Sequence, residues 1–259
     1  MKAVILAGGL GSRLSEETQL KPKPMVELGG KPILWHIMKI YSQFGINDFI
    51  ICSGYKGHVI KEYFHNYFLH NSDVTFDIKN NSLIKHQLPT EKWKVTVVDT
   101  GSDTSTGGRL KRVEKYLKAE ENFCFTYGDG LAKFNMLKQI AFHKKNNKIC
   151  TVLAVKPPSR YGALKVEKGN YVTNFNEKPV DGEDLINGGF FVLSTKCFKY
   201  IKGDKSIWES DVLSKLAKLK QMMAYDECTF WHPMDTLRDQ KILNDMWLKN
   251  KATWKNWKK

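Results

Sequence analysis

The chain has 259 residues, of which 42% are apolar and 12% aromatic, so it can fill a hydrophobic core and is not an intrinsically disordered protein. Its net charge of +14 favours anionic partners, namely nucleic acid, acidic membranes or polyphosphate substrates. The basic residues are scattered, without a long basic arm or a nucleic-acid-binding motif, so we expect no nucleic-acid partner. No apolar stretch approaches the ~20 residues of a membrane-spanning helix, and we expect no membrane partner.

The cysteines indicate a reduced protein. Their number is odd, no two of them form a C-x-x-C pair, and several lie in apolar, strand-like runs (Cys52, Cys124, Cys150, Cys197 and Cys228). This pattern is typical of buried thiols in a cytoplasmic protein, and it gives no indication of a structural zinc site. The apolar opening at residues 1–7 is too short for a signal peptide, so we expect a cytoplasmic location.

The N-terminal part alternates between strand and helix patterns. Residues 3–7 form a continuous apolar run, which predicts a strand buried on both faces, and glycines follow it. Apolar residues then recur at spacings of three and four from Pro32 to Phe44, which predicts a helix that ends at Gly45. A strand is predicted at 48–53 and a helix at 58–68. This alternation predicts a parallel sheet with right-handed crossovers.

The remaining elements are predicted from shorter patterns. We expect strands at residues 74–78, 82–86, 94–98, 122–127, 149–155, 161–166, 171–177 and 188–194, and helices at 109–117, 136–145, 208–218 and 237–248. The simplest account is one α/β domain over residues 1–259. Its first part would cover roughly residues 1–130, and its C-terminal part roughly residues 131–259.

A glycine-rich loop follows the first strand, with the sequence Leu6-Ala7-Gly8-Gly9-Leu10-Gly11-Ser12-Arg13-Leu14. Glycines let the backbone turn tightly and present its N–H groups to a phosphate. Arg13 adds a permanent charge with a fork geometry for phosphate oxygens. The loop is neither a P-loop nor a dinucleotide fingerprint, because it lacks G-K-[ST] and has Leu14 at the third glycine position. Taken alone, it could also be an ordinary surface turn.

Lys23 follows this loop on a stiff segment. Pro22 and Pro24 restrict the backbone around it to extended conformations. The lysine is therefore a candidate for a phosphate contact, and the alternative is an ordinary exposed lysine.

Two aspartates are candidates for binding Mg²⁺. Asp129 follows a buried strand and is flanked by glycines, and Asp235 lies between an apolar run and a helix. Ligands bind at the carboxyl ends of strands in open parallel sheets, and Mg²⁺ is commonly held by one or two carboxylates plus substrate phosphates. The alternative for Asp235 is a helix N-cap.

Three further turns are weaker candidates for sugar-phosphate contacts. They are Thr106-Gly107-Gly108-Arg109, Glu177-Lys178-Pro179 and Asn187-Gly188-Gly189. Glu177 can accept hydrogen bonds from sugar hydroxyls, and Lys178 can pair with a phosphate.

Together these segments resemble the sugar-nucleotide pyrophosphorylase family, also called nucleotidyltransferases. The family pattern G-G-x-G-[ST]-R-L followed by P-K-P is met at residues 8–14 and 22–24, with Ser12 where threonine is commoner. The resemblance covers essentially the whole chain, including Tyr127-Gly128-Asp129-Gly130. The segment Pro233-Met234-Asp235-Thr236-Leu237-Arg238-Asp239 points to the cytidylyl-transferring branch.

The resemblance implies a Rossmann-like, three-layer α/β fold with a mixed, mostly parallel sheet of the GT-A type, and a homo-oligomer. Within the single domain, it implies a nucleotide-binding part over roughly residues 1–130 and a sugar-binding and C-terminal part over roughly residues 131–259. It also implies the reaction of CTP with α-D-glucose 1-phosphate to give CDP-glucose and pyrophosphate, with Mg²⁺ as cofactor. The product would serve the synthesis of dideoxyhexoses in the O-antigen of lipopolysaccharide. Alternatives are UTP or dTTP as the nucleotide, a non-catalytic regulatory subunit, and a nucleic-acid-binding module. The presence of Arg13, Lys23, Asp129 and Asp235 together speaks against a non-catalytic protein.

The expected mechanism is in-line attack of the sugar phosphate on the α-phosphorus, with Arg13 holding the triphosphate and Lys23 touching the α-phosphate. The catalytic residues would be Arg13, Lys23 and Asp129, and the metal ligands Asp129 and Asp235. The nucleotide would be bound by Leu6, Ala7, Gly8, Gly9, Gly11, Ser12, Arg13, Lys23, Thr106, Gly108 and Arg109. The sugar phosphate would be bound by Arg109, Tyr127, Glu177, Lys178, Asn187 and Gly188.

Overall fold

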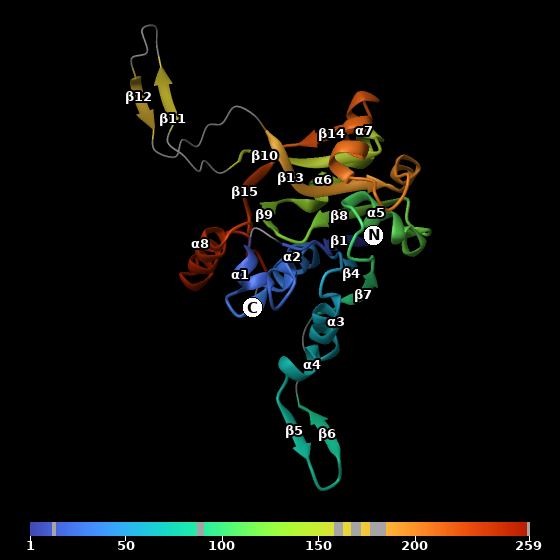
Figure 1. Cartoon of the computed structure of the whole chain (residues 1–259), viewed down its shortest axis with the longest axis vertical. Coiled ribbons are helices and arrows are strands. Elements are labelled where there is room, and N and C mark those ends of the chain that lie inside the picture. The colour runs from blue at the N-terminus through green and yellow to red at the C-terminus, as the bar shows by residue number, and fades with distance from the viewer. Residues whose placement is uncertain (12–13, 87–90, 158–162, 167–171, 177–184, 258–259) are drawn as a thin grey trace.

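The computed structural model describes residues 1–11, 14–86, 91–157, 163–166, 172–176 and 185–257. Its centre is a seven-stranded sheet with the order β14-β10-β13-β8-β1-β4-β7 (Figure 1). The strands are β1 (Ala3–Ala7), β4 (Asp48–Ser53), β7 (Lys94–Asp99), β8 (Asn122–Tyr127), β10 (Cys150–Val155), β13 (Ile186–Ser194) and β14 (Met222–Tyr225). Only β13 runs antiparallel to its neighbours, so the predicted mixed, mostly parallel sheet is confirmed.

Helices cover both faces of the sheet. One core cluster contains Ile5 of β1 and residues of α2 (Ile33–Ser42), α3 (Gly57–His65), α6 (Met136–Asn146) and α8 (Leu237–Leu248). The other contains Val4 of β1 and residues of α5 (Thr106–Arg112), the π-helix η5 (Trp208–Leu213) and α7 (Ser214–Lys218). Alternate residues of β1 therefore enter opposite layers, which explains its continuous apolar sequence.

Several predicted helices differ from the observed ones at their ends. The helix expected at 58–68 is two helices, α3 and α4 (Tyr67–His70), separated at Asn66. The helix expected at 109–117 begins earlier, as α5, and continues as the 3₁₀ helix η3 (Glu114–Leu117). The helix expected at 208–218 starts as the π-helix η5. The helix α8 has the predicted bounds, and its N-cap is Thr236 in a capping box with Asp239.

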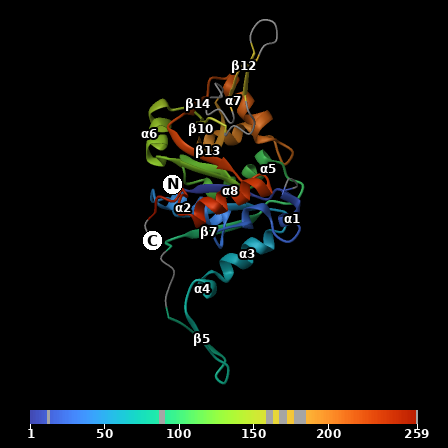
Figure 2. The same cartoon turned by 90° about the vertical axis from the view of Figure 1, so that its left-hand side faces the viewer.

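Small elements complete the described structure. They are α1 (Ser15–Thr18), η2 (Lys23–Met25), η4 (Thr195–Tyr200), and the strand pairs β2 (Glu27–Leu28) with β3 (Lys31–Pro32), β5 (Val74–Asp77) with β6 (Ser82–Lys85), β9 (Gly130–Phe134) with β15 (Cys228–Pro233), and β11 (Ala163–Val166) with β12 (Val172–Asn176). The β5–β6 hairpin projects away from the rest of the molecule beyond α4 (Figures 1 and 2). The β9–β15 pair was not predicted, and it has Asp129 and Asp235, the two candidate metal ligands, at one end.

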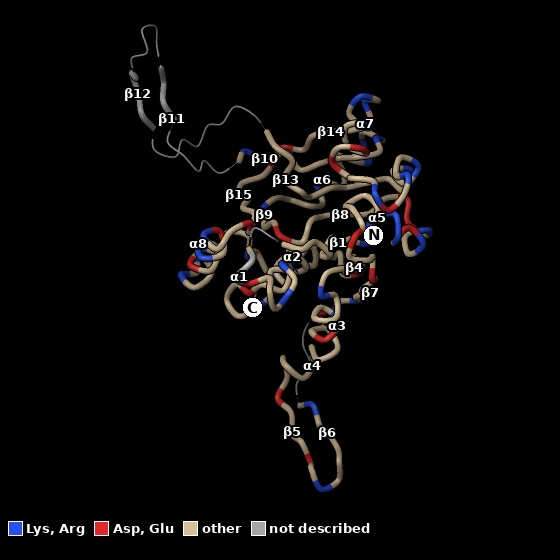
Figure 3. The backbone as a smooth tube through the Cα atoms, viewed as in Figure 1, with Lys and Arg blue, Asp and Glu red and all other residues tan. Residues whose placement is uncertain are grey.

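Charged residues are spread over the described structure, and most of the cysteines are buried. Lysines and arginines occur on most elements and are interspersed with acidic residues (Figure 3). All five cysteines are free, and four of them are buried. Among the described residues, no helix is both long and apolar enough to cross a membrane.

Candidate active site

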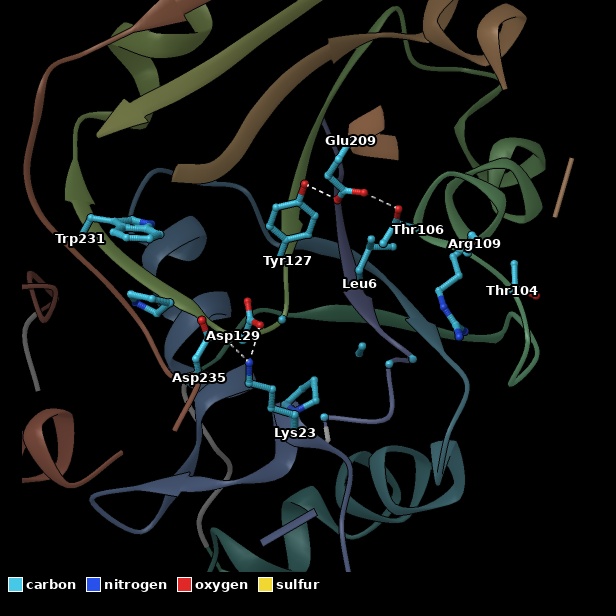
Figure 4. A pocket seen from close by; sticks show the side chains of 18 residues that line it. Leu6, Lys23, Thr104, Thr106, Arg109, Tyr127, Asp129, Glu209, Trp231 and Asp235 are labelled. Atoms are coloured by element: carbon cyan, nitrogen blue, oxygen red, sulfur yellow. Dashed lines mark hydrogen bonds and ion pairs between the residues drawn. The ribbon is translucent and has the colours of Figure 1, made fainter. Parts of the chain in front are cut away.

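A cavity of about 610 Å³ lies at the carboxyl ends of β1 and β8 (Figure 4). This is the edge at which ligands bind in open α/β sheets. Its lining includes most of the described residues that the sequence predicted for the site. The lining residues are Leu6, Ala7, Gly8, Gly9, Gly11, Lys23, Pro24, Thr104, Ser105, Thr106, Arg109, Tyr127, Gly128, Asp129, Glu209, Trp231, Pro233 and Asp235.

Lys23 and the two predicted metal ligands meet at one point in this cavity. The Lys23 Nζ donates to Asp129 Oδ2 at 2.7 Å and to Asp235 Oδ1 at 2.8 Å. Burial of the ammonium lowers its pKa, but the two carboxylates outweigh that effect, so the pKa of Lys23 is raised. Lys23 therefore carries its charge, and the three side chains form one ionic cluster.

The β9–β15 pairing explains how two aspartates so far apart in the sequence come together. Gly130 at the start of β9 pairs with Pro233 at the end of β15. The backbone N–H of Met234 also donates to the carbonyl of Asp129 at 2.8 Å. Asp129 precedes β9 and Asp235 follows β15, so both lie at the same end of this antiparallel ladder, and both side chains reach Lys23 (Figure 4).

The donor set fits a divalent cation that is shared with a substrate. Asp129 and Asp235 direct one oxygen each to a single cationic atom, and carboxylate oxygen is the preferred protein ligand of Mg²⁺. Among the described residues, no group of three or more His, Cys, Asp and Glu side chains is arranged to hold a metal. A metal at these two carboxylates would therefore need phosphate and water oxygens to complete its coordination.

The glycine loop lines the cavity next to this cluster. Gly11 has a φ of +65°, a conformation that favours glycine. At Gly8, an added Cβ would lie 2.2 Å from Arg109 Nη1, so a side chain there would have to displace the Arg109 guanidinium. The Gly8 carbonyl also accepts a hydrogen bond from the backbone N–H of Tyr55 at 3.2 Å. Ser12 and Arg13, predicted for the triphosphate, lie outside the described residues.

Arg109 lines the cavity but directs its guanidinium to neighbouring loops. Its Nη1 donates to Thr100 Oγ1 at 2.9 Å and to the Gly101 carbonyl at 2.6 Å, and its Nη2 donates to the Ser102 carbonyl at 3.0 Å. Burial lowers the pKa of Arg109. The side chain therefore packs against Gly8 and joins α5 to the segment after β7. Its predicted contacts with substrate stay predictions.

Gly108 lies against the backbone of Asp204. It does not line the cavity, and a Cβ at this position would lie 2.2 Å from the Asp204 carbonyl oxygen. The absence of a side chain therefore lets α5 pack closely against the segment before η5, which is a structural role. Its predicted contact with the base stays a prediction.

Glu209 joins two walls of the cavity and was not predicted. The Tyr127 hydroxyl donates to Glu209 Oε1 at 2.6 Å, and the Thr106 hydroxyl donates to Oε2 at 2.7 Å (Figure 4). Burial and the Glu209 carboxylate raise the pKa of Tyr127, so its hydroxyl stays protonated. Glu209 lies on the π-helix η5, and such helical turns are frequent at functional sites.

The residues predicted for the sugar lie beside the main cavity or outside the described chain. Asn187 and Gly188 line an adjoining cavity of about 40 Å³ that shares Tyr127, Asp129 and Trp231 with the main one. The Trp231 Nε1 donates to the Gly188 carbonyl at 2.7 Å. Glu177 and Lys178 lie outside the described residues. Thr104, Ser105 and Trp231 were not predicted, because each is an isolated residue in a short polar or apolar run.

Comparison with known proteins assigns the fold and the family. The family model described as nucleotidyl transferase matches residues 2–236. Glucose-1-phosphate cytidylyltransferases of Salmonella typhi and Salmonella typhimurium are each 57% identical over 257 residues, which covers 99% of this chain and 100% of each relative. The crystal structure of HddC from Yersinia pseudotuberculosis superposes with a TM-score of 0.67 at 24% identity, covering 95% of this chain and 99% of HddC. The chain belongs to the nucleotidyl transferase family.

Proposed function

We propose that this protein is a glucose-1-phosphate cytidylyltransferase, which converts CTP and α-D-glucose 1-phosphate to CDP-glucose and pyrophosphate. The observation that carries the reaction type is the meeting of Lys23, Asp129 and Asp235 beside a glycine-rich loop at the carboxyl edge of the sheet. The identity of 57% to the Salmonella cytidylyltransferases over nearly the whole chain supports the choice of nucleotide and sugar. Mg²⁺ is the proposed cofactor.

The residues of the cavity position the substrates and balance their charge. The backbone N–H groups of the glycine loop would hold the triphosphate, and Lys23 would pair with the α-phosphate. Asp129 and Asp235 would hold Mg²⁺, which supplies positive charge where the leaving pyrophosphate becomes more negative. An oxygen of the sugar phosphate attacks the α-phosphorus, the bond from this phosphorus to the bridging oxygen breaks, and pyrophosphate leaves. No side chain needs to form a covalent bond with the substrate.

The sugar end of the cavity is proposed to lie around Tyr127 and Asn187. The Asn187 Nδ2 donates to the Tyr127 hydroxyl at 3.4 Å, and that hydroxyl is held by Glu209. These polar groups offer both donors and acceptors to sugar hydroxyls. Glu177 and Lys178, by resemblance, would complete this part of the site.

Selection of cytosine is proposed on the similarity to the Salmonella enzymes rather than on geometry. Cytosine differs from uracil by an amino group in place of a carbonyl, so the discriminating contact must come from a hydrogen-bond acceptor. The closest alternative within the family is therefore a uridylyl- or thymidylyltransferase.

A nucleotide panel tests the proposal. The purified protein is incubated with glucose 1-phosphate, Mg²⁺ and, separately, CTP, UTP, dTTP, ATP or GTP, and pyrophosphate release is measured. The expected result is the highest kcat/KM with CTP. Preferential use of UTP or dTTP would retain the reaction type and reject the proposed nucleotide, whereas no release with any of the five would reject the function. The matched control is the Asp129→Asn variant, which should release pyrophosphate far more slowly.

Three associated properties stay proposals. They are the homo-oligomeric state, the cytoplasmic location, and the use of the product for dideoxyhexoses of the O-antigen. The relatives named above support them only through the reaction that they are named for.

A further inference from the structure

Lys23 cannot contact the α-phosphate and the two aspartates at the same time. The proposed reaction places its ammonium on the α-phosphate, yet the structure places it between Asp129 and Asp235, at 2.7 Å and 2.8 Å from their oxygens. The same two oxygens are the proposed ligands of Mg²⁺, which requires its own oxygens at about 2.0–2.1 Å. The ammonium therefore occupies the position that the metal ion would take.

We propose that Lys23 is a built-in counter-ion of the metal site, which the metal ion bound to the nucleotide displaces. This inference rests on the proposed function, because it takes the nucleotide as the carrier of the metal. Every charged group keeps an oppositely charged partner. The two carboxylates would bind the metal ion in place of the ammonium, and the ammonium would pair with the α-phosphate in place of the carboxylates.

The local structure permits the side chain to move while its backbone stays in place. Pro22 and Pro24 flank the residue, and the backbone N–H of Val26 donates to the Lys23 carbonyl at 3.1 Å, so the start of η2 is fixed. The lysine side chain has a flexible four-carbon stem and lines the cavity directly. Its ammonium can therefore turn from the aspartates to a phosphate in the same cavity without a change of fold.

The exchange predicts an order of binding. With Lys23 in place, a metal ion that arrives alone must compete with a covalently tethered cation, so it binds weakly. A metal ion that arrives on a triphosphate also delivers the new partner of Lys23, so it binds without leaving the ammonium buried beside a second positive charge. The site thus favours the metal–nucleotide complex over the free metal.

Binding of Mn²⁺ in the absence of nucleotide and sugar tests this inference. Mn²⁺ serves as a spectroscopic substitute for Mg²⁺, and its free concentration is followed by electron paramagnetic resonance. The Lys23→Met variant should bind Mn²⁺ at least about tenfold more tightly than the unchanged protein, because the competing cation is gone. Adding Asp235→Asn to Lys23→Met should remove this gain.

Lys21→Met is the matched control. Lys21 lies two residues away, and its Nζ is 3.8 Å from carboxylate oxygens of Glu17 and Glu27, so the variant removes the same charge without touching the two aspartates. Its Kd for Mn²⁺ should stay within about twofold of that of the unchanged protein. If Lys23→Met does not fold, Lys23→Gln, which keeps a polar side chain, replaces it in the titration.

The outcomes separate this inference from the proposed function. An equal or weaker Mn²⁺ affinity in the Lys23 variant would overturn the inference, and CDP-glucose synthesis by the unchanged protein would leave the proposed function standing. Tighter binding in the variant, together with no sugar nucleotide formed from any nucleoside triphosphate, would support the inference about the metal site and reject the function. An equal gain in Lys21→Met would show a general charge effect and would also overturn the inference.

Discussion

Replacement of Gly8 by alanine should destabilise the protein, whereas the same replacement at the neighbouring Gly9 should not. A Cβ at Gly8 would lie 2.2 Å from Arg109 Nη1 and 2.6 Å from its Cζ, but a Cβ at Gly9 would have no atom within 4 Å. The two glycines belong to the same loop, yet Gly8 is buried and Gly9 is exposed. A comparison of the two variants therefore separates the effect of steric crowding from the effect of reduced backbone flexibility.

The expected loss of stability in Gly8→Ala follows from the contacts that Arg109 would lose. Its guanidinium is held by the Thr100 hydroxyl and by three carbonyls, and a buried charge that loses one such hydrogen bond costs about 1.5–3 kcal/mol. Forcing the atoms apart without losing a bond costs about 1–3 kcal/mol as overpacking. We therefore expect Gly8→Ala to lower the free energy of unfolding by about 2 kcal/mol, and Gly9→Ala to change it by less than about 1 kcal/mol in either direction.

Urea unfolding of the two variants and the unchanged protein, followed by tryptophan fluorescence, measures these differences without any ligand. The midpoint should fall clearly for Gly8→Ala only, with the same dependence on urea concentration in all three proteins. Equal stability of Gly8→Ala and Gly9→Ala would refute the account in which Arg109 packs against the glycine loop.

Three further predictions concern the metal, acid stability and the cavity wall. Asp235→Asn should lower kcat by about 100-fold or more with little change in thermal stability, and near-normal turnover in Mg²⁺ would remove it from the metal site. Burial lowers the pKa of His36 to about 4, so the unfolded chain takes up a proton at a higher pH than the folded protein does. The free energy of unfolding, measured with urea, should therefore fall by about 2–3 kcal/mol between pH 6.5 and 4.5. A fall of equal size in His36→Gln would contradict this cause. Glu209→Gln can accept only one of the hydrogen bonds from Tyr127 and Thr106, so kcat/KM for glucose 1-phosphate should fall about tenfold, and an unchanged value would reject its positioning role.

The acid prediction depends on a fixed neutral form of His36. Its Nε2 is 2.8 Å from the Leu28 carbonyl, which can only accept, so Nε2 carries the hydrogen. The Nδ1 then accepts from Trp254 Nε1 at 3.4 Å. Protonation would place a second hydrogen opposite that donor. The stabilisation is therefore fully present above pH 6.5 and is lost as the pH falls toward 4.

The sequence predicted the sheet and most of the residues that line the cavity, because both depend on local patterns. The apolar run of β1 followed by Gly8 and Gly9 identified a strand and a glycine-rich loop, and the glycines around Asp129 marked a strand end. The bounds of β8 and α8 were predicted correctly from periodicity and turn residues. These signals need only neighbouring residues.

The parts that were missed depend on contacts between distant segments. The β9–β15 pairing unites Asp129 with Asp235, and no feature of either segment alone specifies its partner. Glu209 is one glutamate in a helical pattern, and its role appears only when Tyr127 and Thr106 lie on either side of it. The close packing of α5 at Gly108 likewise depends on Asp204, which is distant in the sequence.

The most direct test of the central claim is the fate of an oxygen label. Glucose 1-phosphate carrying ¹⁸O in its phosphate group is incubated with CTP, Mg²⁺ and the protein, and both products are analysed by mass spectrometry. Attack of the sugar phosphate on the α-phosphorus predicts CDP-glucose that retains all of the label and pyrophosphate that contains none. Labelled pyrophosphate, or the absence of CDP-glucose, would contradict the account.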